Sequence, residues 1–424
     1  DALKGANGAT EQYKLLKSVE RDATPSWLRS RLQLQQARIE ARAHNIDAAL
    51  TGYDCAIRTM KAMAQPTSCI VAASGFTGAA PASGTALADV QLERASVALE
   101  KVNGNMEAVQ AEYAQAIDTL IQSGRSTNGT QQPTLIGYFR LLIKKAKTNP
   151  SDDTNAQFFR AMQAVGDPAI ASDMARLANV VASDGTIGSK IRDKVDLERR
   201  ITQLRYQIAS LPETDLAGKA ALEQQRQAAE SSLATVNTEL NRNNRYLAQD
   251  DSPVSIDDMR TTLGDGEIYL KLIQIRGSMF GVAIDATKVS IFEVPVPTGD
   301  LAKLTKVVFD SAHSTIRPDG SRSIDPYNVE ASYALFRAIT GPAYGDVAAA
   351  KAIIFDPSGP VRQVPLGILA SDADSVKRYK AGRKRDAFDY SGVNFVATKA
   401  NLAMALSPRS FLLVRSKVAQ STAP

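Results

Sequence analysis

The chain has 424 residues, of which 44% are hydrophobic and 22% charged, and its formal net charge at pH 7 is +5. This length allows two or three domains, each with its own core. The small positive excess gives no argument for a nucleic-acid partner. No run approaches the ~18 consecutive apolar residues that a membrane-spanning helix needs, so we expect neither a nucleic-acid partner nor a membrane span.

Two cysteines, Cys55 and Cys69, lie close together in the first part of the chain. A metal site would need further cysteines or histidines beside them, and only His44 is near, so the sequence predicts no metal site and no cofactor. A disulfide between the two cysteines would indicate an exported or periplasmic protein. Two reduced, buried thiols would fit a cytoplasmic one. Both alternatives stay open.

Residues 1–185 are predicted to be helical and contain an internal repeat, because the segment Asn45–Ile57 aligns with Asn105–Ile117. In each copy, small or apolar residues fall on one helix face. These residues are Ala49, Tyr53, Ala56 and Ile57 in the first copy and Val109, Tyr113, Ala116 and Ile117 in the second. Ala37 lies where the preceding helix would present a small residue.

This repeat resembles the second helix of a tetratricopeptide (TPR) repeat, in which small residues let paired helices approach. The copies start at Asn45 and Asn105, a spacing wider than the ~34 residues of that repeat. The Gly-, Ala- and Ser-rich stretch 72–86 accounts for the excess as an inserted loop. Ordinary helical hairpins are the alternative. We expect a TPR-like array that binds a protein or peptide partner.

Residues 186–250 are predicted to form a long antiparallel helical hairpin around the turn at Leu211–Pro212. Apolar residues recur at three- and four-residue steps on both sides of this turn. They are Ile191, Val195, Leu197, Ile201, Leu204 and Ile208, then Leu222, Ala229, Leu233, Val236 and Leu240. We expect this stripe to pack on its own neighbour rather than on a partner.

Residues 251–424 read as an α/β domain that begins with a capped helical turn at Ser255–Met259. Alternating patterns predict strands at 267–275, 279–284, 289–294, 352–355 and 393–397, and helices at 298–311, 326–339 and 410–415. The first three strands follow one another directly and predict a meander. Helices between the later strands imply crossovers, and therefore a mainly parallel sheet.

The segment Ala352–Leu369, AIIFDPSGPVRQVPLGIL, combines a short β-branched strand, a turn and an apolar run. It resembles the phrase that opens the protease half of the CHAT family, caspase-like cysteine peptidases attached to TPR-type arrays. Asp356–Pro357–Ser358 stands where that family has Pro–Asp. We expect Asp356 and Ser358 to be turn-forming residues rather than catalysts.

Further phrases extend this resemblance over most of residues 250–415. They are Asn244–Leu247 with Leu263–Glu267, Tyr333–Phe336 with Gly341–Pro342, the predicted strand Asn394–Ala397, and Leu406–Ser410. In the last phrase Arg409 separates Pro408 from Ser410, whereas in the family the serine follows proline directly. The implied fold class is α plus α/β, a TPR-like array and a helical hairpin followed by part of a caspase-like domain.

In the CHAT family the catalytic histidine and cysteine lie beyond this Pro–Ser step, at the ends of two further strands. The resemblance therefore implies that this chain stops before the dyad, and we predict no catalytic, cofactor or metal residue within it. A Ser-His-Asp arrangement using His313 and Asp310 lacks a nucleophile-elbow motif and is rejected. The 424-residue polypeptide is therefore expected to be inactive as a peptidase.

Two other functions remain as alternatives. The helical array could belong to a non-enzymatic protein-binding scaffold, because helical solenoids present extended surfaces. The basic run Lys377–Arg385 could bind nucleic acid, but runs of like charge repel one another, so we expect a solvated surface loop there.

Overall fold

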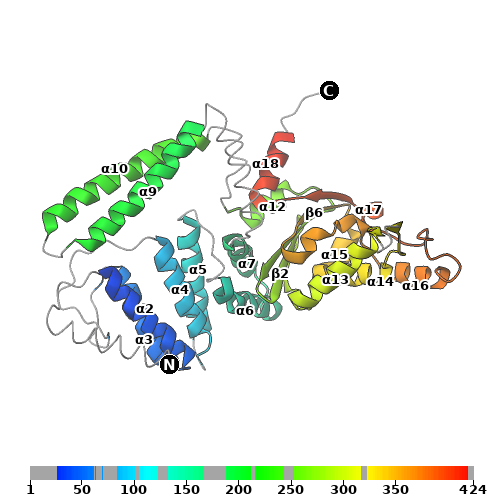
Figure 1. Cartoon of the computed structure of the whole chain (residues 1–424), viewed down its shortest axis with the longest axis horizontal. Coiled ribbons are helices and arrows are strands. Elements are labelled where there is room, and N and C mark those ends of the chain that lie inside the picture. Colours follow the sequence, from blue (N-terminus) through cyan, green and yellow to red (C-terminus); the bar gives the residue numbers. More distant parts are fainter. Residues whose placement is uncertain are drawn as a thin grey trace. The chain divides into compact units, whose positions relative to one another are not determined.

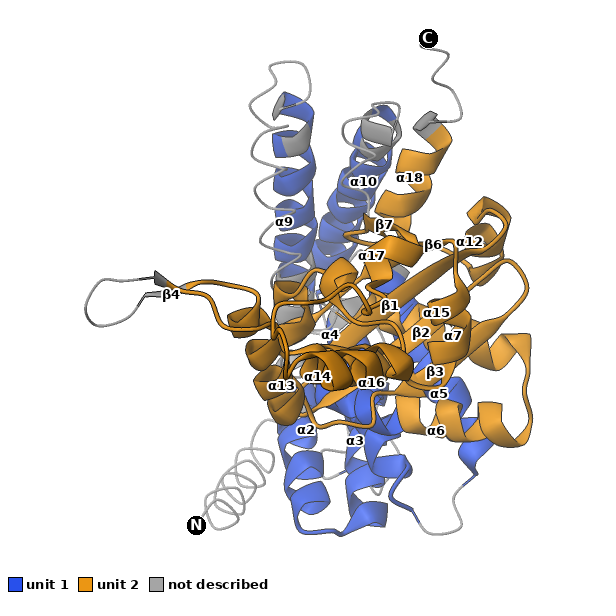
Figure 2. Ribbon diagram, turned by 90° about the vertical axis from the view of Figure 1, so that its right-hand side faces the viewer, with its two compact units in different colours: residues 1–138, 171–249 blue, residues 139–170, 250–424 orange. Residues whose placement is uncertain are grey.

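The computed structural model describes residues 26–61, 63, 69, 84–101, 105–122, 132–165, 188–211, 215–241, 253–316 and 322–418. The chain forms two compact units (Figure 2). Unit 1 comprises residues 1–138 and 171–249, and unit 2 comprises residues 139–170 and 250–424. Residues 139–170, assigned above to the helical region, thus belong with the α/β part of the chain.

Unit 1 consists of helices paired as hairpins in its described part. They are α2 (Ser26–Arg42), α3 (Ile46–Met60), α4 (Gly84–Ala98), α5 (Met106–Gln122), the start of α6 (Leu135–Thr148), α9 (Gly188–Ser210) and α10 (Leu216–Asn241). The part of the predicted helical region that follows Val165, up to residue 185, lies outside the described residues, as do residues 72–83 of the predicted loop. Residues 84–86 of that loop are helical instead, because α4 begins at Gly84.

The two repeat copies occupy equivalent places in unit 1. Asn45 immediately precedes α3 and Asn105 immediately precedes α5, and the Asn105 side chain accepts hydrogen bonds from the backbone N–H groups of Glu107 and Ala108. The predicted face is buried in both helices, except that Ile57 is half-buried. A Cβ at Gly52 would lie 2.9 Å from the Cβ of Ala37, so α2 and α3 pack closely at small residues, as predicted.

Helix α9 ends at Ser210 and α10 begins at Leu216, and most of the predicted turn between them, from Pro212, lies outside the described residues. The predicted stripe is buried at Ile201, Leu204 and Ile208 on α9 and at Ala229 on α10. Val195, nearer the start of α9, is 37% exposed. The apolar stripe is therefore buried along the C-terminal half of α9, and it is more exposed to solvent near the N-terminal end of that helix.

Unit 2 contains a five-stranded mixed sheet with the order β3-β2-β1-β6-β7. Its strands are β1 (Glu267–Ile275), β2 (Ser278–Ile284), β3 (Val289–Glu293), β6 (Ala352–Asp356) and β7 (Asn401–Met404). β1, β2 and β3 pair antiparallel as the predicted meander, and β1, β6 and β7 run parallel. A small hairpin of β4 (Thr315–Ile316) and β5 (Arg322–Ser323) was not predicted.

Helices cover both faces of this sheet (Figure 1). One face packs Leu270, Ile353 and Phe355 against α13 (Thr298–Ser311) and α14 (Val329–Thr340). The same core also includes residues of α15 (Tyr344–Ala349) and of the short helices η2 (Gly341–Ala343), η3 (Gly359–Gln363) and η4 (Leu366–Ile368). Both predicted helices of this region are confirmed, α13 at the predicted boundaries.

The opposite face of the sheet carries α6 from Phe139 onward, α7 (Asp152–Ala164), α12 (Ile256–Thr262) and α18 (Pro408–Val418). Phe139 stacks on Phe280 of β2 with ring centroids 4.8 Å apart, and Phe411 of α18 packs beside Tyr269 of β1. The predicted cap of α12 is confirmed, because Ser255 and Asp258 form a reciprocal capping box.

The C-terminal part of the sheet differs from the prediction. Residues 393–397 do not form a strand: Phe395 makes an isolated bridge to Ala370, and Val396 begins the short helix α17 (Val396–Lys399). The actual strand, β7, follows at Asn401. Val393 and Val396 resemble strand residues because they are buried, whereas β7 is exposed along its whole length and gives no alternating burial signal.

The basic run also adopts a different structure from the predicted loop. Residues Ala373–Gly382 form helix α16, and only the end of the run, from Arg383, lies in a turn. The N-terminal cap of this helix is Asp372, whose carboxylate accepts a hydrogen bond from the backbone N–H of Ser375. A local cap therefore outweighs the repulsion among the cations.

Within the part of the chain that the structure describes, no helix is both long enough and apolar enough to cross a bilayer. Cys55 of α3 and Cys69 are joined in a disulfide, with their Cα atoms 5.6 Å apart, and both are buried. The sequence left this pairing open. The bridge connects α3 to the segment that leads toward α4.

We predict that removing the disulfide destabilises the folded chain. Closing a loop of this length is worth about 3 kcal/mol through the lost entropy of the unfolded chain. Urea unfolding of the oxidised protein, the reduced protein and the Cys55→Ser/Cys69→Ser variant measures this effect. We expect reductant to lower the midpoint for the natural chain and to leave the variant unchanged. A natural chain insensitive to reductant would contradict the assignment.

Candidate functional site

A buried charged cluster joins β1 and β6. Lys271 of β1 lies opposite Asp356 of β6 in the parallel register, and Tyr269 lies two residues earlier on the same face of β1. The Lys271 ammonium is 2.8 Å from Asp356 Oδ2, and the Tyr269 hydroxyl donates to the same oxygen at 2.6 Å. The side chains of Lys271 and Asp356 are only 8% and 1% exposed. The carboxylate is thus neutralised inside the sheet.

This cluster corrects the interpretation of Asp356. The residue ends β6 and forms an ion pair, rather than forming the turn. The buried charge of Asp356 is compensated by the Lys271 ammonium and the Tyr269 hydroxyl. A buried, compensated ion pair of this kind fits a structural role. A lysine in the middle of an otherwise apolar buried strand was the available sequence signal, but its partner lies 85 positions away along the chain.

The turn after β6 is fixed to the end of β1. The Ser358 hydroxyl accepts a hydrogen bond from the backbone N–H of Gln274 at 3.3 Å. Gly359 has φ +65°, and a Cβ there would lie 2.1 Å from Gln274 Oε1, so glycine is required. Ser358 therefore positions the turn, as predicted, and directs Val361 and Val364 into the core.

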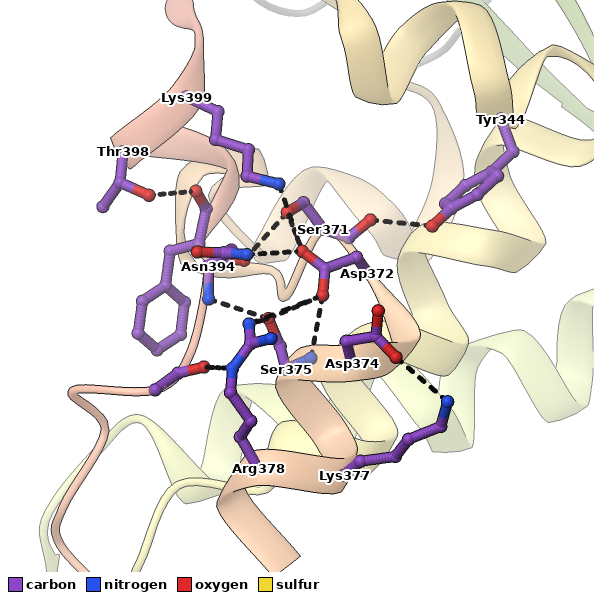
Figure 3. Close-up of polar contacts among 12 residues, drawn as sticks. Tyr344, Ser371, Asp372, Asp374, Ser375, Lys377, Arg378, Asn394, Thr398 and Lys399 are labelled. Atoms are coloured by element: carbon purple, nitrogen blue, oxygen red, sulfur yellow. Dashed lines mark hydrogen bonds and ion pairs between the residues drawn. The ribbon is translucent and has the colours of Figure 1, made fainter.

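A second polar cluster surrounds Asp372 at the start of α16 (Figure 3). Its carboxylate accepts hydrogen bonds from the Asn394 amide at 2.8 Å, from the Lys399 ammonium at 3.1 Å, and from Ser375. Asn394 and Lys399 belong to the segment that leads into β7. The Asp372 side chain thus connects the start of α16 to the segment that immediately precedes β7.

Electrostatics at Asp372 favour the ionised carboxylate. Partial burial acts to raise its pKa, but the hydrogen bonds from Asn394, Ser375 and Lys399 outweigh burial and hold the pKa well below its usual range. Such a carboxylate is a poor general base at neutral pH, because a base works best with a pKa near the operating pH. The arrangement fits a structural anchor.

The basic run is largely paired with acids of the same unit. Lys377 pairs with Asp374, and both Lys380 and Arg383 pair with Glu330 of α14. The Arg378 guanidinium donates to the carbonyl of Gly392 at 2.7 Å. These contacts reduce the positive field available to a phosphate backbone, which gives the nucleic-acid alternative no support.

Neither histidine forms a catalytic arrangement. His44 is exposed in the turn between α2 and α3, with φ 58°, at the helix junction. His313 is exposed after α13, where its Nδ1 lies 2.7 Å from the Phe309 carbonyl, while the Asp310 carboxylate pairs with Lys306. The Ser-His-Asp alternative therefore has no supporting geometry in this region.

Unit 1 contains its own charged network, centred on neighbouring residues of α4. The Glu93 carboxylate binds the Arg38 guanidinium of α2 at 2.6 and 2.8 Å and accepts from the Tyr53 hydroxyl of α3 at 3.3 Å. Arg94 pairs with Asp54 of α3 and Glu112 of α5. Ion pairs thus connect both repeat copies through α4.

Among the described residues, both cysteines belong to the disulfide, and no group of three or more His, Cys, Asp or Glu side chains could hold a metal ion. No family model, no curated protein and no solved structure matches the chain. Within the described residues, the clusters around Lys271, Asp372 and Glu93 connect elements of each unit to one another.

We predict that Lys271→Met destabilises unit 2 strongly. The substitution removes the cation and leaves the Asp356 carboxylate buried, which costs about 3–5 kcal/mol. The double variant Lys271→Met/Asp356→Asn should recover much of that loss. Lys288→Met is the matched control, because Lys288 and Asp346 form an exposed pair, and its loss costs about 1 kcal/mol or less. Equal effects at Lys271 and Lys288 in urea unfolding would refute this assignment.

A pH-dependent effect is predicted at Asp89 of α4. Burial, together with repulsion from Glu93, raises the pKa of this carboxyl to about 6. Because its folded pKa exceeds its unfolded pKa, the contribution of Asp89 to stability is largest below about pH 4 and is lost as pH rises through 6.

Asp89→Asn should therefore stabilise the chain at pH 7.5, by about 1 kcal/mol after allowance for partial exposure, and by much less at pH 4. Thermal unfolding across this range measures the difference between the variant and the natural chain. Asp47→Asn, at a side chain that is 82% exposed, is the control and should bring no gain in stability at pH 7.5. A gain at Asp89 that does not vary with pH would contradict the prediction.

Proposed function

We propose that this chain is the N-terminal and central part of a CHAT-type, caspase-like cysteine peptidase. Under this proposal, unit 1 is a TPR-like array that recruits a protein substrate or regulator, and unit 2 begins the caspase-like domain. The catalytic histidine and cysteine would lie in sequence that follows Pro424, so the 424-residue chain alone would be inactive.

The proposal is supported by where the segments that resemble the CHAT family lie. They stand at the ends of strands and helices of one mixed sheet. Leu263–Glu267 leads directly into β1, where the Gly264 N–H donates to the Glu267 carboxylate at 2.9 Å. Pro357–Pro360 follows β6 and is fixed by Ser358. Ser407 and Ser410 exchange hydrogen bonds at the start of α18. Each phrase thus has a local structural role in the order that the resemblance implies.

Unit 1 supports the recruiting role through its two repeat copies. Their buried small residues and the Arg94 bridge between Asp54 and Glu112 join consecutive hairpins into one array. Arrays of this kind present extended surfaces to polypeptides. The same features support the second candidate, a non-enzymatic scaffold, and catalysis is the property that separates the two.

The disulfide supports an exported location within the proposal. Disulfides persist in oxidising compartments and are rare in the cytoplasm, and Cys55 and Cys69 are bridged. Their bridging also leaves neither of them as a nucleophile, because the reactive species of a cysteine peptidase is the thiolate.

The proposal is tested with the full-length gene product, assayed for cleavage of a peptide library. We expect thiol-dependent cleavage that is abolished when one cysteine beyond Pro424 is changed to Ala. The Cys55→Ser/Cys69→Ser variant is the control and should keep its kcat once folded. Cleavage by the 424-residue chain, or cleavage that survives every cysteine substitution, would refute the proposal. An inactive full-length protein that binds a defined polypeptide through residues 26–241 would favour the scaffold.

A further inference from the structure

The outer edge of β7 is an exposed, largely apolar feature of unit 2. All four residues of this strand are exposed, with Met404 at 71% and Leu402 at 38%, and Leu406 just beyond it is also 38% exposed. Within the part of the chain that the structure describes, β7 ends the sheet, and no strand pairs with its outer side. Such an edge is a template for another strand.

The hydrogen-bonding groups of β7 are arranged for this pairing. The N–H groups of Asn401 and Ala405 donate inward, to the carbonyls of Lys351 and Phe355, both at 2.9 Å. Because backbone groups alternate along a strand, the N–H and C=O groups of Leu402 and Met404 point outward. Natural edge strands are normally protected by charges, prolines or bulges. Residues Asn401–Leu406 contain no charged residue and no proline.

The other edge of the sheet shows that protection. Glu293, at the end of β3, pairs with Arg140 of α6 at 2.7 Å, and Lys288, just before β3, pairs with Asp346. Charged side chains therefore mark the β3 edge, and apolar ones mark the β7 edge. The contrast indicates that β7 is covered in the functional state.

A strand that directly followed α18 in the chain would not reach the open edge of β7. The crossovers from β3 to β6 and from β6 to β7 pass over the face that holds α13, η3 and η4, and both move outward toward β7. Helix α18 lies on the opposite face, where Phe411 contacts Tyr269. A right-handed crossover over that face leads back toward β6, away from the open edge.

We propose that β7 pairs antiparallel with β7 of a second copy of this chain, across a twofold axis at Ala403. This register places Leu402 opposite Met404 of the second copy, so that the outward backbone groups of each form a hydrogen-bonded pair. It also places Asn401 opposite Ala405, and Lys399 opposite Ser407. Leu402 thus meets Met404, Ala403 meets its own copy, and no like charges meet, which favours a stable cross-strand pairing.

The pairing would join two five-stranded sheets into one continuous sheet. The pairing strand, Asn401–Met404, lies between the family-like phrases Asn394–Ala397 and Leu406–Ser410 and belongs to neither of them. The two proposals therefore fail separately: a monomeric peptidase would refute only the dimer, and a dimeric scaffold would refute only the peptidase.

Sedimentation velocity of the 424-residue chain over micromolar concentrations tests the dimer. We expect a dimer whose dissociation constant rises at least about tenfold in Met404→Lys, because each dimer carries the charge twice at the paired edge. Ile324→Lys is the matched control, since Ile324 is 69% exposed and lies outside β7. It should leave the dissociation constant unchanged.

Amide hydrogen exchange locates the interface. The amides of Leu402 and Met404 should exchange slowly in the dimer and quickly in Met404→Lys. A chain that stays monomeric, or a dimer equally sensitive to both lysine substitutions, would overturn the proposal. Slow exchange of these amides in a monomer would assign the edge to a strand of the same polypeptide instead, and would also overturn it.

Discussion

The ion pair between Lys271 and Asp356 is the constraint on which unit 2 depends. β1 is the strand at which the antiparallel meander meets the parallel strands, and this pair crosses from β1 to β6. Burying two charges is costly unless each has a partner. The parallel register between β1 and β6 satisfies both at once, and a shift of one residue would move Lys271 to the other face of the sheet. The ion pair thus specifies the register of the parallel half.

Much of the fold was predictable because its signals are local. β1 is rich in β-branched and apolar residues and α13 shows a helical period, and both occupy the predicted residues. The prediction of the last strand was wrong for a physical reason. A strand is recognised by one buried face, and β7 has none, so the buried Val393 and Val396 suggested a strand eight residues too early.

The polar clusters were less predictable, because their partners are distant along the chain. Lys380 and Arg383 were predicted to belong to a repelling basic run, but both pair with Glu330, which lies on another helix. Lys271 was an unusual residue within an apolar strand, yet nothing local identifies Asp356 as its partner. The cysteine pair shows the same limit, since sequence spacing permits the bridge between Cys55 and Cys69 but does not require it.

The unequal edges of the sheet determine what kind of assembly is open to this chain. Two apolar edges would allow head-to-tail addition without end, which produces fibres. Here the β3 edge carries the Glu293–Arg140 pair, and only the β7 edge is uncharged and apolar. When only one edge of the sheet can pair, and it pairs with the same edge of a second chain, the assembly is complete as a dimer. The same absence of charge that exposes β7 to association therefore also limits that association to a dimer.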